Sequence, residues 1–200
     1  MRLIESVPNF SEGRRAEVIE EIVNEGRKID GVWILDYSSD PNHNRSVVTL
    51  TGVPEAIEEA LFDMTKKARD LIDLKNHSGE HPRMGSADVI PLIPVMNTTK
   101  DECIELSRRL GRRIGEELSI PVYLYEDSAT SPERVSLSNI RKGEFENFNS
   151  KITQEAWKPD FGPSSVHPSA GVVAVGCREY LIAFNVNLGT DNIEIANKIA

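Results

Sequence analysis

Residues 46–74, SVVTLTGVPEAIEEALFDMTKKARDLIDL, join a β-branched run directly to a long amphipathic pattern. The run at 46–52 predicts a strand, because side chains branched at Cβ favour extended backbone. Pro54 suits the first turn of a helix, and the apolar residues after it recur at helical spacing. The stretch therefore predicts a strand followed at once by a helix over residues 54–74.

The same alternation continues on both sides of this stretch. LIESV (3–7) and VWILDY (32–37) predict strands, the second of them buried, and a helix between them with Ser11 as its N-cap. ADVIPLIPV (87–95) predicts a strand that contains two prolines. The resulting order, β-α-β-β-α-β, is the split β-α-β or ferredoxin-like arrangement. We expect the two helices to be the crossovers that parallel neighbouring strands require.

Further elements follow residue 95. Thr99 and Glu102 form a capping box ahead of a helical pattern. Beyond it we expect a strand at 122–126, one or two short helices within 131–152, two strands around a turn near Arg178, and a helix from Thr190. The fold class predicted is α/β (α+β), a ferredoxin-like sandwich with helices packed on a mixed sheet. The last helical pattern is still open at Ala200, so we expect either a fragment or an end that a partner completes.

Composition excludes some classes of protein. Among 200 residues the formal net charge is −9, which argues against nucleic acid binding because phosphate recognition depends on Lys and Arg. The N-terminus lacks a signal-peptide pattern, and no apolar stretch approaches the roughly 20 residues of a membrane span. We therefore expect a cytoplasmic protein that binds neither membrane nor nucleic acid. Cys103 and Cys177 are expected to be small buried side chains.

The irregular stretch NHSGEHPRMG (76–85) holds two of the four histidines. His81 suits proton transfer, because the unperturbed pKa of histidine lies near working pH. His77 and His81 have the HxxxH spacing of some zinc sites, but a glycine and a proline break the helix that such a site needs. We therefore expect no metal. From spacing alone, a polar loop with incidental histidines stays an equal alternative.

Three more loops carry candidate groups. In SSDPNHNRS (38–46), Asp40 can orient an imidazole and Arg45 can hold a carboxylate, although an Asp-Pro turn with solvated charges is the simpler reading. PDFGPSSVHPSAG (159–171) offers backbone N–H groups and hydroxyls to a polar ligand, or is a linker. VPNFSEG (7–13) places Asn9, Ser11 and Glu12 at a helix N-terminus, where anions bind or simple capping occurs.

Together these segments resemble the formiminotransferase (glutamate formimidoyltransferase) family. The resemblance covers essentially the whole chain and is carried by SVPNFSEG, LDYSSDPNHNRSVVTLTG, LIDLKNHSGEHPRMGSADVIPLIPV, PVYLYE, IRKGEFE, PDFGPSSVHPSAG and LIAFNVNLGT. It implies transfer of the formimino group of N-formimino-L-glutamate to N5 of tetrahydrofolate in histidine degradation, giving 5-formiminotetrahydrofolate and L-glutamate. It also implies a homodimer, and two α/β subdomains with a folate tunnel between them. Residues 1–180 match the N-terminal subdomain, and 181–200 match the first strand (about 181–188) and first helix of the second.

The resemblance also implies residue roles. The histidine of GEHPR, here His81, is implied as the catalytic acid and base, and we expect Asp40 or Glu80 to orient it. Arg83 and Arg45 are expected to hold substrate carboxylates, with Asn9 as a further substrate-binding residue. The implied folate-binding residues are Gly162, Pro163, Ser164, Ser165, Val166, His167, Pro168, Ser169, Ala170 and Gly171. His77 is expected to cap the preceding helix as a cation.

Two alternatives stay open from the sequence. The chain could be a folate-binding or assembly module without turnover, because the second subdomain is incomplete in these residues. It could also use the same folate in a related reaction, either formyl transfer from N-formylglutamate or cyclisation of 5-formyltetrahydrofolate. The distinction between formyl and formimino donors does not follow from the residues above.

Overall fold

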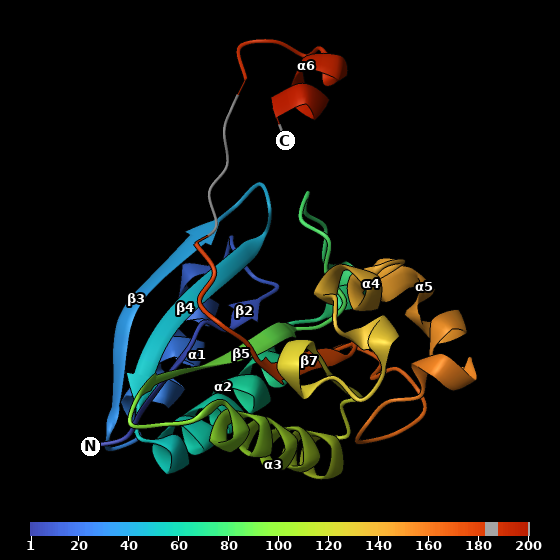
Figure 1. The fold of residues 1–200 in the computed structure, drawn as a ribbon. Coiled ribbons are helices and arrows are strands. Elements are labelled where there is room, and N and C mark those ends of the chain that lie inside the picture. The colour runs from blue at the N-terminus through green and yellow to red at the C-terminus, as the bar shows by residue number, and fades with distance from the viewer. Residues whose placement is uncertain (183–187, 200) are drawn as a thin grey trace.

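The computed structural model describes residues 1–182 and 188–199. Within them, the strands form one mixed sheet in the order β3-β4-(β1, β2)-β5-β7-β6, with β1 and β2 successive parts of one row (Figure 1). The strand bounds are β1 (Leu3–Ser6), β2 (Asn9–Phe10), β3 (Val32–Asp40), β4 (Arg45–Gly52), β5 (Ala87–Met96), β6 (Val122–Leu124) and β7 (Val173–Cys177). The predicted α/β class, a mixed sheet with helices packed on it, is confirmed.

The first part of the sheet fits the ferredoxin-like order. The β1–β2 row lies between β4 and β5 and runs antiparallel to both. Helix α1 (Ala16–Arg27) connects this row to β3, and α2 (Pro54–Leu71) connects β4 to β5. The two strands joined by each helix are parallel but are separated by one strand, so the expectation of parallel neighbours is wrong here. Parallel pairing begins where β5 meets β7 and β7 meets β6, and α3 (Lys100–Leu118) connects β5 to β6, which lie on either side of β7.

Helices α1, α2 and α3 lie against one face of the sheet (Figure 1). Their apolar side chains interlock with alternate strand residues such as Val48 and Leu50, which are completely buried. Burying a side chain of that size contributes about 1.5–3 kcal/mol, so this layer supplies most of the stability. The predicted capping box is confirmed: the Thr99 hydroxyl accepts the Glu102 N–H at 3.2 Å, and the Glu102 carboxylate accepts the Thr99 N–H at 2.7 Å.

The opposite face of the sheet is only partly covered. Two short helices, α4 (Leu137–Arg141) and α5 (Glu144–Lys151), lie over β5 and β7 and bury Tyr123, Phe148 and their neighbours (Figure 1). The other short elements are 3-10 turns at Leu74–Asn76, Glu126–Ser128, Pro132–Arg134 and Glu155–Trp157, and helix α6 at Ile193–Ile199. The face of β4 and of the β1–β2 row next to α4 stays accessible, and this position is where the polar loops gather.

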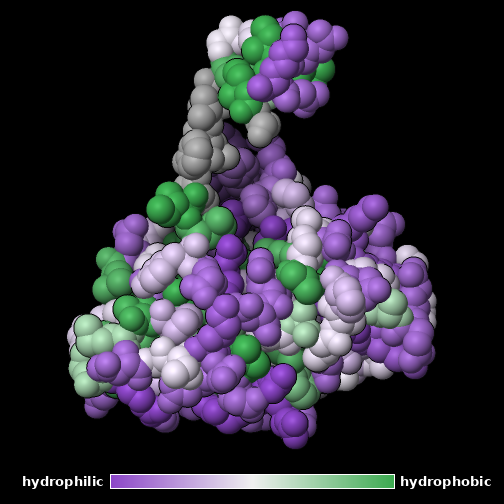
Figure 2. All heavy atoms as spheres, in the orientation of Figure 1, coloured by the Kyte–Doolittle hydropathy of each residue, from purple (hydrophilic) through white to green (hydrophobic). Residues whose placement is uncertain are grey.

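Two local predictions near the N-terminus are wrong. Strand β3 is an edge strand whose Trp33 and Leu35 are 48% and 56% exposed, not buried. Apolar spheres accordingly line the edge of the surface over β3 (Figure 2). Ser11 does not cap a helix, because α1 begins at Ala16 and the Ser11 hydroxyl instead donates to the Gly85 carbonyl at 2.7 Å.

The structure describes only part of the C-terminal segment for which predictions were made. The strand expected at about 181–188 falls mostly outside the described residues, so the division at residue 180 stays a prediction. Helix α6 begins at Ile193, later than Thr190. Cys103 and Cys177 are both completely buried, as predicted. None of the helices in the described residues combines the length and apolar composition that crossing a membrane requires.

Candidate functional site

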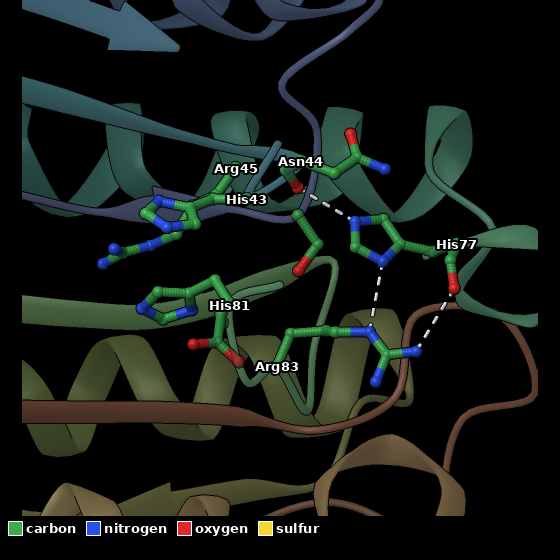
Figure 3. Close-up of a pocket in the computed structure, with 8 residues that line it drawn as sticks. His43, Asn44, Arg45, His77, His81 and Arg83 are labelled. Carbon is green, nitrogen blue, oxygen red and sulfur yellow. Dashed lines mark hydrogen bonds between the residues drawn. The ribbon is translucent and has the colours of Figure 1, made fainter. Parts of the chain in front are cut away.

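Asn44 ties three of the four candidate loops together. Its side-chain oxygen accepts the Gly13 N–H at 2.9 Å, its side-chain amide donates to the Ser78 carbonyl at 3.0 Å, and its own carbonyl lies 2.9 Å from Nε2 of His77. Asn44 has a left-handed backbone, with φ of 50°, a conformation that asparagine tolerates better than most residues. The loops 7–13, 38–46 and 76–85 therefore meet at one point, as Figure 3 shows for the last two.

Two glycines allow the loops to approach one another. A Cβ added to Gly79 would lie 2.2 Å from the His43 carbonyl oxygen, and one added to Gly13 would lie 2.2 Å from the Asp40 carbonyl oxygen. Contacts this short would force the backbone apart, so any larger side chain separates the loops. The glycine of the GEHPR stretch thus serves the packing of the histidine loop against the β3–β4 turn.

His81 lies at the crevice between these loops with one ring nitrogen fixed. Its Nδ1 lies 2.7 Å from the Pro82 carbonyl oxygen, which can only accept, so Nδ1 carries the proton and Nε2 of the neutral ring has a free lone pair. Nε2 forms no hydrogen bond within the described part of the chain. Burial, followed by the charges of Arg45 and Arg141, lowers the pKa of His81. The neutral ring at working pH is therefore arranged to accept a proton at Nε2.

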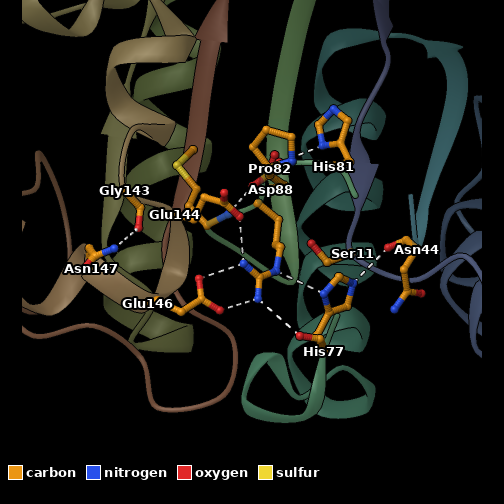
Figure 4. Close-up of polar contacts among 12 residues, drawn as sticks. Ser11, Asn44, His77, His81, Pro82, Asp88, Gly143, Glu144, Glu146 and Asn147 are labelled. Atoms are coloured by element: carbon orange, nitrogen blue, oxygen red, sulfur yellow. Dashed lines mark hydrogen bonds and ion pairs between the residues drawn. The ribbon is translucent and has the colours of Figure 1, made fainter. Parts of the chain in front are cut away.

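Arg83 is held within the protein. Its Nη1 donates to Glu144 at 2.9 Å and to Glu146 at 2.8 Å, its Nη2 to Glu146 at 2.5 Å, and its Nε to Nδ1 of His77 at 3.1 Å (Figure 4). The Phe145 N–H also donates to the Arg83 carbonyl at 3.0 Å. These contacts join the histidine loop to the start of α5. Arg83 is predicted to hold a substrate carboxylate. In the described structure it instead holds two carboxylates of the chain itself, those of Glu144 and Glu146.

Arg45 and Arg141 are the less engaged cations of the site. Arg45 forms no ion pair with any described residue, and its buried Nε has no hydrogen-bond acceptor. Arg141 on α4 donates to Asp88 at 2.6 Å, while its own buried Nε is also without an acceptor. Asp88, 2% exposed, accepts the Met84 N–H at 2.7 Å as well and so fixes the end of the histidine loop. The guanidinium of Arg45 lies beside the rings of His43 and His81 (Figure 3).

A cavity of about 400 Å³ opens beside Arg45 on the uncovered face of the sheet. Alternate residues of three neighbouring strands form its floor, because successive side chains of a strand point to opposite faces. Asn9 and Arg45, two of the predicted substrate-binding residues, both line it, and Arg141 of α4 forms part of its wall. Arg45 also lines the crevice that holds His81, so the cavity and the crevice share this side chain.

Asp40 and Glu80 do not contact His81 in the described structure. The Asp40 carboxylate accepts the backbone N–H groups of Asn42 at 2.8 Å and His43 at 3.0 Å, and lies 3.4 Å from Nδ1 of His43. Glu80 is exposed, and its backbone N–H donates to the Asn42 carbonyl. The imidazole that faces Asp40 is that of His43, whose ring centroid is 6.0 Å from that of His81. Catalytic roles for Asp40 and Glu80 stay predictions.

The predicted folate-binding loop lies apart from the crevice. None of Gly162–Gly171 is among the residues that line the crevice or the cavity. His167 is turned into its own loop, where Nδ1 accepts the Ala170 N–H at 3.0 Å. The end of the loop reaches the end of the histidine segment, where Gly171 and Gly85 form an antiparallel bridge and the Ala170 carbonyl accepts the N–H of the following Ser86 at 2.9 Å. A folate contact at this loop stays a prediction.

Two further observations complete the site. Among the described residues, no group of three or more His, Cys, Asp or Glu side chains is arranged to hold a metal ion. Sequence reasoning missed Asp88 and Arg141 and assigned no role to His43 or Asn44. His43 and Asn44 lie in the loop 38–46, and Arg141 lies in IRKGEFE. The motifs that contain these residues support the family resemblance, but they do not indicate the role of each residue.

The geometry thus defines an α/β domain in which a histidine with one free ring nitrogen lies at a crevice lined by arginines. Comparison with known proteins gives the family. Residues 3–178 match the formiminotransferase domain, N-terminal subdomain, and the chain belongs to this family. The family prediction made from the motifs is confirmed.

The chain can be aligned over its whole length with several known proteins. It is 53% identical to a glutamate formimidoyltransferase of Streptococcus pyogenes serotype M1 and 49% identical to one of Thermoplasma acidophilum. It is also 46% identical to a formimidoyltransferase-cyclodeaminase of Rattus norvegicus. Each match covers 100% of this chain, but only 67%, 66% and 37% of the respective relatives. The chain thus spans about two thirds of the shorter relatives and about a third of the longer one.

Proposed function

We propose that this chain provides the acid–base site of a glutamate formimidoyltransferase. The reaction moves the formimino group of N-formimino-L-glutamate to N5 of tetrahydrofolate, a co-substrate, and gives 5-formiminotetrahydrofolate and L-glutamate. The names of the relatives support formimino transfer. The observation that carries the proposal is the arrangement of His81, whose Nδ1 is fixed by the Pro82 carbonyl while Nε2 stays free beside Arg45.

The proton balance of the reaction fits one imidazole. A new C–N bond forms between N5 and the amidine carbon, and the C–N bond between that carbon and the glutamate nitrogen breaks. N5 loses one proton and the departing nitrogen gains one. His81 takes the first proton at Nε2 and returns it to the departing nitrogen, which leaves the residue unchanged after each turnover. Positioned acid–base catalysis of this kind contributes about 10²–10⁴-fold.

The lowered pKa of His81 suits this role. A base must be unprotonated when substrate binds, and both burial and the neighbouring cations favour the neutral ring. After the ring accepts a proton, the same cations make the imidazolium a strong acid, which favours return of the proton to the departing nitrogen. Arg45 therefore assists in two ways: it attracts the anionic donor and it keeps the base neutral.

The cavity beside Arg45 gives room for substrate. A volume of about 400 Å³ is within the range of small-molecule sites, and Arg45 lines both this cavity and the crevice of His81. We assign the donor to this cavity, with Asn9 and Arg45 as binding residues. Holding two substrates together removes part of the entropic barrier of a bimolecular reaction, so this arrangement contributes to the rate beyond the imidazole itself.

The remaining expectations belong to the same proposal. Gly162–Gly171 would contact the folate from the loop that ends next to Ser86. The reaction would be a step of histidine degradation in the cytoplasm, and the protein would act as a homodimer. No metal takes part in the proton transfers described above.

An activity assay tests the proposal. The protein assayed is this chain extended to the length of the shorter relatives. It is mixed with tetrahydrofolate and N-formimino-L-glutamate, and formation of 5-formiminotetrahydrofolate is followed. N-formyl-L-glutamate is tested as the alternative donor. We expect turnover with the formimino donor. Turnover only with the formyl donor would overturn the donor assignment, and folate binding without turnover of either donor would support a binding module instead. The 200-residue chain assayed in parallel shows whether it is sufficient.

A further inference from the structure

Arg83, one of the two cations predicted to hold substrate carboxylates, has no N–H donor left for a ligand. Its Nη1 and Nη2 donate to the carboxylates of Glu144 and Glu146, and its Nε donates to His77. Its remaining contact is to the His77 carbonyl at 3.3 Å. Two carboxylates therefore already neutralise this cation, and a substrate would have to displace both.

Arg45 and Arg141, in contrast to Arg83, have N–H donors without acceptors among the described residues. Both line the cavity, and each has a buried Nε without an acceptor in the described part of the chain. Donors without acceptors are unfavourable in a partly buried site, so the pair favours a ligand that supplies acceptors. The only carboxylate that pairs with either residue among those described is Asp88, which pairs with Arg141, so Arg45 is left without an ion-pair partner although Glu5, Glu179 and Arg178 also line the cavity. Burial and the nearby Arg141 both lower the pKa of Arg45, as expected for two cations in one confined space.

The position of the pair identifies which anion it suits. Arg45 lines the crevice together with His81, so whatever it binds lies next to the reacting atoms. In N-formimino-L-glutamate the departing nitrogen is bonded to Cα, and the α-carboxylate is bonded to that same carbon. The γ-carboxylate lies at the far end of the side chain. The carboxylate that accompanies the reacting nitrogen into the crevice is therefore the α-carboxylate.

We propose that Arg45 and Arg141 together bind the α-carboxylate of the donor, and that Arg83 serves instead to hold the loop in position. This proposal rests on the proposed function for the identity of the donor. A carboxylate between two guanidinium groups accepts from both and gives Arg45 the ion-pair partner that it lacks among the described residues. The pair would thus select donors that carry a carboxylate on the carbon next to the transferred group.

The test compares donors with and without that carboxylate. N-formimino-L-glutamate and 4-(formimidoylamino)butanoate differ only in the α-carboxylate. We expect Arg141→Met to lower the ratio of kcat/KM for the first donor to kcat/KM for the second by about 10–100-fold, the size of effect of a hydrogen bond to a charged group. An equal loss for both donors would overturn the proposal, because it would mean that Arg141 supports the site without contacting the α-carboxylate.

A binding measurement keeps the proposal testable if no transfer is detected. Calorimetric titration with L-glutamate and with 4-aminobutyrate measures selectivity for the α-carboxylate directly. We expect the unmodified protein to prefer L-glutamate and Arg141→Met to lose that preference, whatever the activity. Absence of the preference in the unmodified protein would overturn the proposal.

Two further variants separate binding from folding. Arg141→Lys retains a cation beside Asp88 but lacks the second guanidinium branch, so we expect it to fold and yet to lose most of the selectivity. The matched control is Arg108→Met on α3, whose guanidinium is exposed and pairs with Glu105. It should leave selectivity unchanged. Full selectivity in a folded Arg141→Lys variant would contradict the two-guanidinium geometry.

Discussion

The Nε–H of Arg83 donates a hydrogen bond to Nδ1 of His77 at 3.1 Å, and this contact fixes the protonation state of His77. A ring nitrogen that accepts a hydrogen bond carries no proton, so the proton lies on Nε2, which donates to the Asn44 carbonyl. Burial and the Arg83 charge both lower the pKa of His77, in agreement with a neutral ring. The expectation of a cationic helix cap is wrong, because His77 is a neutral link between two loops.

The neutral state of His77 makes stability depend on pH. The unfolded chain protonates this histidine near pH 6.5, whereas the native state does so only at lower pH. Between the two pKa values the unfolded state binds more protons, so the free energy of unfolding decreases as the pH falls below about 6.5. Urea unfolding from pH 7.5 to pH 5 measures this slope. His77→Gln should flatten it, and an unchanged slope would contradict the neutral link.

The carboxylates around Arg83 should matter for stability more than for chemistry. We expect Arg83→Met to lower the free energy of unfolding by about 1–3 kcal/mol, because it leaves His77 and Glu146 without their donor. The loss stays moderate since Glu144 and Glu146 are 43% and 57% exposed and regain water. Urea denaturation measures it, with Glu146→Gln as the smaller change. In the selectivity assay Arg83→Met should affect both donors alike, and a loss confined to the donor with the α-carboxylate would return Arg83 to the binding site.

Gly79 should tolerate no side chain. Gly79→Ala places a Cβ against the His43 carbonyl oxygen, so the histidine loop must move away from the β3–β4 turn. We expect about 1–3 kcal/mol of destabilisation and a marked loss of turnover. Gly189→Ala is the matched control, because no atom of another described residue, its two chain neighbours apart, lies within 4 Å of its Cβ position. Equal thermal midpoints and activities of the two variants would contradict the close approach.

The pH dependence of catalysis should reflect the cations around His81. Activity requires the neutral ring, and the pKa of that ring is lowered from 6.5 by burial, Arg45 and Arg141. The acid limb of kcat/KM is therefore expected below pH 6.5. Arg45→Gln removes one of the charges and should shift the limb to higher pH, while also weakening donor binding. A limb that stays fixed in Arg45→Gln would show that another group is being titrated.

Much of the fold could be predicted because it depends on local patterns. The helix from Pro54, the capping box at Thr99 and the β-branched run at 46–52 carry their signals in adjacent residues. The edge position of β3 could not be predicted, because VWILDY has the same apolar composition whether or not a second strand pairs with it. The same holds for Ser11, whose hydroxyl binds the Gly85 carbonyl from a distant segment.

The candidate site divides in the same way. His81 could be singled out from its motif, and Arg45 and Asn9 both line the cavity, while their roles toward substrate stay predictions. The partners of these residues could not be predicted. The ion pairs of Arg83 and Arg141 are formed with Glu146 and Asp88 respectively, which are distant from them in sequence. Charges that cancel across the fold leave no pattern in the sequence.

The central claim is that His81 carries the protons in formimino transfer, and single-turnover kinetics of His81→Ala test it most directly. With tetrahydrofolate and N-formimino-L-glutamate both saturating, we expect the rate of transfer to fall by about 10²–10⁴-fold, and added imidazole to restore part of it. Equilibrium binding of either substrate should change little. A transfer rate in His81→Ala within a few-fold of the unmodified protein would contradict the account.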